Sequence, residues 1–233
     1  MNYVFLGADR TGKSSTMLAL AKILANVDKK VLVIDTTQSQ GVYSFFDYNF
    51  DIEVKNPLDE GKTIVRENFE IVFSNMESEF EFEKLNKYNF SKYDYVFIEG
   101  DKNLPPHLVN TAHIILFQDF DKHTLLKNKI ILKKFKIDAN KLTVIFNNML
   151  DDVKLKDHFL DELFAEIKLN ISGLNEIFEI PFEEVDIVNT IENKTDGYLD
   201  LKAYSNCYKS AIYEIVNSIE EIDKKTFKKI LGK

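Results

Sequence analysis

The chain has 233 residues, of which 45% are hydrophobic, and this is enough to bury one large core. Its net charge is -8 and its pI is near 5.2, which argues against a protein that coats nucleic acid with a basic face, and so against direct DNA binding. A single cysteine, Cys207, excludes an internal disulfide, and we expect it to be buried in a late helix. The length suits one domain, 1–233. No apolar run is long enough to span a bilayer, and we expect a reducing cytoplasm.

The chain opens on the apolar run NYVFLG at 2–7, which predicts a strand that is buried on both faces. The residues GADRTGKS at 7–14 fit the pattern G-x-x-x-x-G-K-[ST], the loop that cradles nucleotide phosphates. A helical pattern follows at 14–26, so the motif lies at the strand-to-helix junction that its mechanism requires. The sequence therefore predicts a P-loop that binds a nucleotide with Mg²⁺.

The residue types in this loop have chemical reasons to be there. Gly7 and Gly12 allow backbone conformations in which consecutive N–H groups point at phosphate oxygens. Lys13 would bring its charge to the outer phosphates, and Ser14 would offer a hydroxyl to Mg²⁺. The N-terminal end of the helix adds its positive dipole. The predicted nucleotide-binding set also includes Arg10, Thr11 and Ser15.

Further apolar runs predict more buried strands, at 29–35, 94–100, 112–117 and 142–148. Strands that alternate with helical patterns indicate an α/β fold, a mostly parallel sheet flanked by helices on both faces. Ligands bind at the carboxyl ends of the strands in such sheets. We predict an extra strand or hairpin within 47–89, and the alternating FEFE at 80–83 is typical of an edge strand.

The order of these elements resembles the ParA/MinD group of P-loop ATPases, a SIMIBI-class family with a deviant Walker A motif. In VLVIDTTQSQGVYSFF, Asp35 ends a strand where the family has an Asp-x-Asp pair, and in YDYVFIEGDKNLPP, Glu99 stands where the family has its Mg²⁺-associated acid. In LTVIFNN, Asn147 stands where the family commonly has an asparagine that hydrogen-bonds adenine. The stretch FEIPFEEVDIV resembles the family's Ile-Pro-x-[ED] segment, which implies that Pro181 and Glu183 lie near adenosine.

The resemblance implies a protein that binds ATP or ADP with Mg²⁺ and that has a protein partner or self-associates. It implies a catalytic set of Lys13, Asp35 and Glu99 and a metal set of Ser14, Asp35 and Glu99. The family positions plasmids, chromosomes, division septa, flagella or pili, so the implied role is a positioning or assembly factor.

Three positions depart from the family pattern. Ala8 replaces the signature lysine, which in the family reaches the nucleotide of a dimer partner. Thr37 replaces the second acid of the Asp-x-Asp pair, which orients the attacking water. Glu99 replaces an aspartate, with Asp101 two residues later. These changes impair hydrolysis more than binding, so we predict weak or absent ATP hydrolysis.

Two other functions stay open. One is a nucleotide-locked scaffold without turnover, in a secretion, pilus or conjugation apparatus. The other is an ATP-dependent ligase, because VFIEG at 96–100 resembles a strand end of dethiobiotin synthetase. That family continues into a glycine-rich segment, whereas this chain continues with DKNLPP.

The last residues, IEEIDKKTFKKILGK at 219–233, form a pattern typical of a basic amphipathic helix. The pattern resembles the membrane-targeting helix of MinD-type proteins, which implies reversible contact with the inner face of the cell membrane. The alternative is that Phe227, Ile230 and Leu231 dock the helix on the domain and leave the lysines in solvent.

Overall fold

The computed structural model describes residues 1–46, 57–74, 80–135, 137, 139–150, 156–165 and 176–232. Their strands, in chain order, are β1 (Asn2–Gly7), β2 (Val31–Asp35), β3 (Ile64–Arg66), β4 (Phe69–Phe73), β5 (Tyr95–Glu99), β6 (His113–Gln118), β7 (Leu142–Met149) and β8 (Glu176–Pro181). They form one 8-stranded sheet in the order β3-β4-β2-β5-β1-β6-β7-β8. Neighbouring strands are parallel except β3 and β4.

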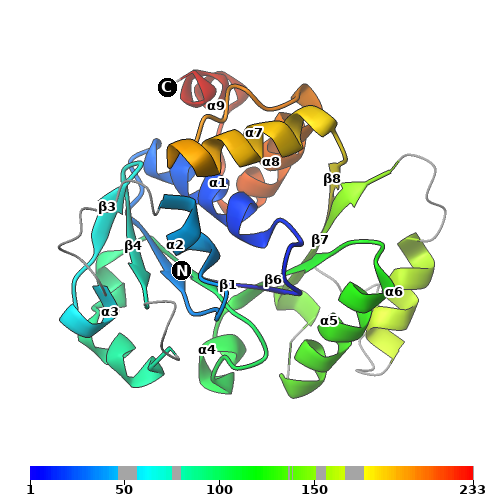
Figure 1. The fold of residues 1–233 in the computed structure, drawn as a ribbon, viewed down its shortest axis with the longest axis horizontal. Coiled ribbons are helices and arrows are strands. Elements are labelled where there is room, and N and C mark those ends of the chain that lie inside the picture. Colours follow the sequence, from blue (N-terminus) through cyan, green and yellow to red (C-terminus); the bar gives the residue numbers. More distant parts are fainter. Residues whose placement is uncertain are drawn as a thin grey trace.

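Helices cover both faces of this sheet, which confirms the predicted α/β fold (Figure 1). Their bounds are α1 (Lys13–Ala25), α2 (Gly41–Phe46), α3 (Pro57–Glu60), α4 (Pro106–Asn110), α5 (Lys122–Lys134), α6 (Lys156–Ala165), α7 (Glu184–Asp196), α8 (Asn206–Ile219) and α9 (Lys224–Leu231). Short 3-10 helices are η2 (Phe82–Lys87), η3 (Phe90–Lys92) and η4 (Ala139–Lys141).

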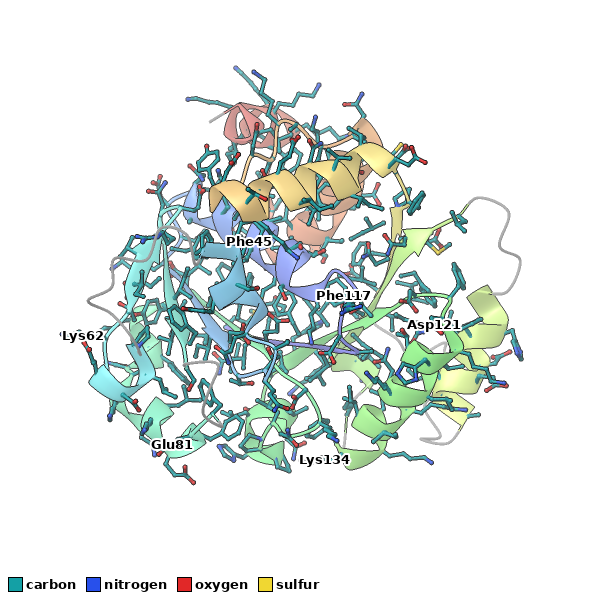
Figure 2. The ribbon with its side chains drawn as sticks, in the orientation of Figure 1. Phe45, Lys62, Glu81, Phe117, Asp121 and Lys134 are labelled. Atoms are coloured by element: carbon teal, nitrogen blue, oxygen red, sulfur yellow. The ribbon has the colours of Figure 1, made fainter. Side chains whose placement is uncertain are left out.

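The sheet separates two apolar cores, and β1 shows how one strand serves both. Tyr3 and Phe5 belong to the core under α1, α2, α8 and α9, whereas Val4 and Leu6 belong to the core under α5 and α6. Successive side chains of a strand point to opposite faces, so a strand covered on both sides has to be apolar throughout. Figure 2 shows Phe45 and Phe117 inside the molecule, while Lys62 and Glu81 lie at its rim.

The hairpin predicted within 47–89 is present as β3 and β4, joined by Glu67 and Asn68, both at positive φ. The prediction of an edge strand at 80–83 is wrong, because η2 begins at Phe82. Phe80 and Phe82 both pack against the core on the α5 face, so their alternation reflects burial, and no described strand pairs with them. The rest of that range, 47–56 and 75–79, lies outside the described residues.

The C-terminal segment docks on the domain. The range predicted as one helix is divided: Ile219 ends α8, and α9 begins after Asp223, whose carboxylate accepts from the backbone of Lys225 and Thr226. Phe227 and Ile230 are buried in the α1-side core, as the docking alternative requires. No helix in the part of the chain that the structure describes is long and apolar enough to cross a membrane.

Cys207 is exposed, so the prediction that it is buried is wrong. It lies in the first turn of α8, next to Tyr208, and it is the tyrosine that faces the core. Exposure depends on the rotation of the helix about its axis, which the composition of one turn does not define.

Candidate functional site

The predicted phosphate loop joins the end of β1 to the start of α1. Gly7 has φ 146° and Gly12 has φ 80°, conformations that side chains disfavour. A Cβ atom at Gly12 would lie 2.2 Å from Nδ2 of Asn147, and one at Gly7 would lie 2.8 Å from the carbonyl oxygen of Phe117. The N-cap residue of α1 is Gly12, which has no side chain to cap the helix, so the first turn presents its N–H groups and its positive dipole to the loop.

A buried asparagine, Asn128 of α5, holds this loop in place. Its Oδ1 accepts from the backbone N–H of Ala8 at 3.0 Å, and its Nδ2 donates to the carbonyl of Phe117 and to Gln118. The sequence analysis missed this residue. The available signal was its place between Leu125 and Leu132 on the buried face of α5, where a polar side chain needs a partner.

Three predicted residues meet where β1 and β5 end. Lys13 Nζ donates to the carbonyls of Gly7 at 3.2 Å and Gly100 at 3.3 Å, and it lies 3.6 Å from Oε1 of Glu99. Ser14 Oγ donates to that same Oε1 at 2.7 Å. The second oxygen, Glu99 Oε2, is buried and has no hydrogen-bond partner among the described residues.

Asp35, at the end of β2, is fully buried and is held by the segment that follows it. One carboxylate oxygen accepts from the backbone N–H of Thr37 at 3.0 Å and from its hydroxyl at 2.6 Å. The other oxygen accepts from the N–H of Val42, in the first turn of α2, at 2.8 Å. In this conformation Asp35 therefore stabilises the start of α2, and the hydroxyl of Thr37 donates to Asp35.

The two buried acids are electrostatically unfavourable, even with Lys13 beside Glu99. Burial, together with the nearby Asp35, raises the pKa of Glu99 to about 7, while Lys13 and Ser14 act in the opposite direction. Burial also raises the pKa of Asp35, although its hydrogen bonds from Thr37 and Val42 favour the charged form. A cation beside these groups would therefore favour their ionisation.

The arrangement fits Mg²⁺ bound mainly by phosphate and water. Mg²⁺ commonly takes only one or two protein ligands beside substrate phosphates. Ser14 Oγ and the unpartnered Glu99 Oε2 are oxygen donors of the right kind, and Gly41 approaches them so closely that a Cβ atom there would lie 2.4 Å from Ser14 Oγ. Among the described residues, no cluster of three His, Cys, Asp or Glu side chains forms a site for a metal ion on its own.

A cavity of about 270 Å³ adjoins the loop on the side of β7 and β8. The structure brings six of the predicted nucleotide-binding residues into its wall: Arg10, Gly12, Ser15, Asn147, Pro181 and Glu183. Asn147 Nδ2 donates to the carbonyl of Thr11 at 2.8 Å, so this side chain supports the loop in the present conformation. Residues that the sequence analysis did not single out complete the wall, among them Ile187 and Ile191 of α7 and the stacked rings of Tyr204 and Tyr208.

A larger cavity, of about 590 Å³, opens on the opposite side of the loop. It is lined by Ala8 and Asp9, by the segments after β2 and β5, and by Lys127 and Ile130 of α5. Lys127 Nζ lies 3.8 Å from the carboxylate of Asp9. The position at which the resemblance places a signature lysine, Ala8, therefore borders an open space with a basic group from another helix.

Solved structures resemble this fold over nearly the whole chain. A chain of the MinC:MinD cell division complex of Aquifex aeolicus superposes with a TM-score of 0.63 at 17% identity, covering 95% of this chain and 96% of that one. A plasmid partition protein of Borrelia burgdorferi B31 bound to AMPPNP superposes with a TM-score of 0.60 at 17% identity, covering 95% of this chain and 99% of that one. The septum site-determining protein MinD of Pyrococcus horikoshii, complexed with Mg-ADP, has a TM-score of 0.60 at 16% identity, covering 97% of this chain and 99% of that one.

The sequence itself matches no protein-family model, and a search of curated protein sequences gives no match either. At these identities, the structural similarity establishes the fold, which is that of the ParA/MinD-like P-loop ATPases.

Proposed function

We propose that this protein binds ATP with Mg²⁺ at the loop formed by residues 7–14 and acts in the bacterial cytoplasm as a positioning or assembly factor with little or no ATP hydrolysis. The observation that carries the proposal is the contact of Ser14 Oγ with Glu99 at 2.7 Å, beside the buried Lys13 and an unpartnered carboxylate oxygen. These groups lie at the carboxyl ends of the parallel strands, where ligands bind in open α/β sheets.

The chain supplies each part of an ATP site. The first turn of α1 and Lys13 would bind the phosphates, because the contacts of Lys13 with described residues are to carbonyl oxygens and Glu99, for which phosphate oxygens can substitute. Ser14 and Glu99 would hold Mg²⁺, and the cavity beside Asn147 and Pro181 would take the nucleoside. Two proteins with this fold carry AMPPNP and Mg-ADP, which supports the choice of ligand.

A calorimetric titration with ATP, with and without Mg²⁺, tests the binding site. We expect Mg²⁺-dependent binding that Lys13→Ala weakens at least about a hundredfold, the size of a lost set of charge-assisted contacts. Lys127→Ala removes a lysine from the neighbouring cavity and is the matched control, for which we expect a change of less than about threefold. Equal effects of the two substitutions would mean that Lys13 has no special role.

Weak hydrolysis follows from Thr37. Its buried hydroxyl donates to Asp35, and a hydroxyl cannot accept a proton near neutral pH as a carboxylate does. The family's second acid is therefore missing from the position that would serve the attacking water. We expect Thr37→Asp to raise the rate of phosphate release with Mg²⁺-ATP by at least about tenfold, at a cost in stability from the second buried acid. A native rate equal to that of the Thr37→Asp variant would contradict this account of Thr37.

The cavity of about 590 Å³ favours a second candidate, an ATP-dependent ligase or phosphotransferase. Its size lies in the range of small-molecule sites, and it adjoins the loop at Gly7 and Ala8, beside Lys127. A carboxylated small molecule in this space would lie next to the terminal phosphate. Screening small carboxylic acids for faster ATP consumption separates the candidates, because a positioning factor needs no such substrate.

The packing of α9 argues against membrane contact through this helix. The apolar side chains that would enter a bilayer, Phe227 and Ile230, are buried in the domain core. The exposed face of α9 carries Lys224, Lys225, Lys228 and Lys229, which solvent accommodates without lipid.

A further inference from the structure

Gln40 lies between the end of β2 and the start of α2, and three of its features are unfavourable for folding alone. The residue is 2% exposed, and its buried Oε1 has no hydrogen-bond partner among the described residues. Its backbone has φ 45°, in the left-handed region that residues with a side chain rarely adopt. Each feature costs free energy, so their coincidence at one residue indicates a requirement other than the fold.

The orientation of the Gln40 amide is fixed by its nitrogen. Nε2 donates to the backbone carbonyl of Thr37 and, at 3.5 Å, to that of Asp35. If the amide were turned over, Oε1 would face these two carbonyl oxygens, and three acceptors would meet without a donor. The local backbone therefore holds Oε1 as an acceptor that is directed away from Thr37 and Asp35.

Gln40 belongs to the segment that contacts the proposed metal site. Asp35 and Glu99 are register partners at the ends of the adjacent strands β2 and β5. The residue after Gln40 is Gly41, and a Cβ atom there would lie 2.4 Å from Ser14 Oγ and 3.9 Å from Glu99 Oε1. Among the described residues, the buried side-chain oxygens without a partner are those of Gln40 and Glu99. Both therefore lie in segments that meet at Ser14.

The chemistry of these two oxygens indicates what they would bind. Both are acceptors, and the oxygens of ATP phosphates also accept, so a phosphate does not satisfy them. Mg²⁺ in nucleotide sites keeps several water molecules, and each of these waters donates hydrogen bonds. A water bound to a cation is polarised and is a stronger donor than ordinary water. Glu99 Oε2 suits the metal or its water, and Gln40 Oε1, which is uncharged, suits the water.

We propose that Gln40 is a positioning residue whose Oε1 accepts a hydrogen bond from a water molecule bound to Mg²⁺. The part of the ATP affinity that Mg²⁺ contributes then depends on Gln40. The inference rests on the proposed function, because it requires Mg²⁺ and nucleotide in the site. It adds to that site a residue that belongs neither to the phosphate-loop motif nor to the contact between Ser14 and Glu99.

The test measures the Mg²⁺ dependence of ATP binding by calorimetry. The Kd for ATP is determined with excess EDTA and with excess Mg²⁺, and the ratio of the two values gives the gain in affinity from Mg²⁺. Gln40→Met keeps the length of the side chain and removes the amide. We expect the ratio to fall at least about fivefold, the effect of one lost hydrogen bond to a polarised water. A structural role alone would weaken binding equally in both conditions, and an unchanged ratio would overturn the inference.

Two further variants act as controls. Gln38 lies in the same segment and is exposed, so Gln38→Met is the matched control, and we expect its ratio to stay within about twofold of the native ratio. Gln40→Glu keeps an acceptor oxygen and loses the donor, so we expect it to retain at least about half of the native ratio. Equal losses in Gln38→Met and Gln40→Met would overturn the inference.

A crystal structure of the native protein with AMPPNP and Mg²⁺ tests the same point without a variant that has to fold. We expect a metal-bound water within about 3.2 Å of Gln40 Oε1. A bound metal whose waters make no contact with Oε1 would overturn the inference. If the native protein binds no ATP in either condition, the inference and the proposed function both fail. If it binds ATP and Gln40→Met leaves the ratio unchanged, the inference fails alone.

Discussion

The chemistry of the site depends on Glu99, which is longer than the aspartate that the ParA/MinD resemblance places at the end of this strand. Its Oε1 accepts from Ser14, and its buried Oε2 is left without a partner in the described residues. An unpartnered buried carboxylate oxygen costs free energy in the protein without ligand. This cost persists only where another requirement outweighs it, and coordination of Mg²⁺ is such a requirement.

The raised pKa of Glu99 predicts how stability depends on pH. Below its ordinary pKa of 4.5 the carboxyl is protonated in both the folded and the unfolded protein. As the pH rises toward about 7, the unfolded chain loses this proton before the folded protein does. The folded state is therefore penalised above pH 7, by roughly 3 kcal/mol at most. We expect the unfolding free energy of Glu99→Gln, relative to wild type, to increase from pH 5 to pH 8 in urea titrations without Mg²⁺. If the difference in unfolding free energy between Glu99→Gln and wild type stays constant with pH, the pKa of Glu99 is not raised by burial.

Individual site residues differed in how far the sequence could predict them. Lys13 and Ser14 stand in a spaced motif whose chemistry fixes their places. Asn128 has no motif, since its role depends on the packing of α5 against the loop, and this contact spans 120 positions of sequence. Asn147 was predicted from resemblance to contact adenine, and the structure places it in the cavity wall with its amide on the carbonyl of Thr11.

At the scale of elements, α2 depends on Asp35. The carboxylate receives hydrogen bonds from the Thr37 hydroxyl and from the buried backbone N–H groups of Thr37 and Val42, which Asp35→Ala would leave without this acceptor. We expect Asp35→Ala to lower the unfolding free energy by about 3 kcal/mol in the absence of nucleotide. Asp9→Ala removes an exposed aspartate nearby and should change the unfolding free energy by less than about 0.5 kcal/mol. If the two variants are equally stable, Asp35 does not hold α2.

Helix α9 gives an element-scale prediction about docking. Phe227 is 5% exposed and contacts the ring of Tyr213 with centroids 5.0 Å apart. We expect Phe227→Ala to lower the unfolding free energy by about 2 to 4 kcal/mol. Phe182→Ala, at a position that is 38% exposed, is the matched control and should cost about 1 kcal/mol or less. An unchanged stability of Phe227→Ala would mean that α9 is not part of the folded core.

The elements that the sequence analysis misjudged share one cause. Phe80 and Phe82 alternate with acids because both rings cover the core, yet no strand of the described residues pairs with them. The run that becomes β8, EIFEIP, was not predicted as a strand, because Glu179 interrupts its apolar pattern; its end was noted only for its resemblance to the family's Ile-Pro-x-[ED] segment. In each case the conformation depends on a neighbouring element, which the local sequence pattern does not identify.

For the whole molecule, the apolar strand runs determined the α/β class, because strands buried on both faces leave a clear pattern. The order β3-β4-β2-β5-β1-β6-β7-β8 could not be read from the chain, since it depends on which crossovers pack. That order places β1 between β5 and β6, which brings the phosphate loop beside Glu99 on one side and Phe117 on the other. The site is thus a property of the assembled sheet.

The central claim is that one site, built at the ends of β1, β5 and β7, binds Mg²⁺-ATP, and a crystal structure with AMPPNP and Mg²⁺ tests it most directly. We predict phosphates at the first turn of α1 beside Lys13, the metal at Ser14 and Glu99, and the adenosine in the cavity of about 270 Å³. A nucleotide bound elsewhere, or a metal that does not involve Ser14 and Glu99, would contradict the account.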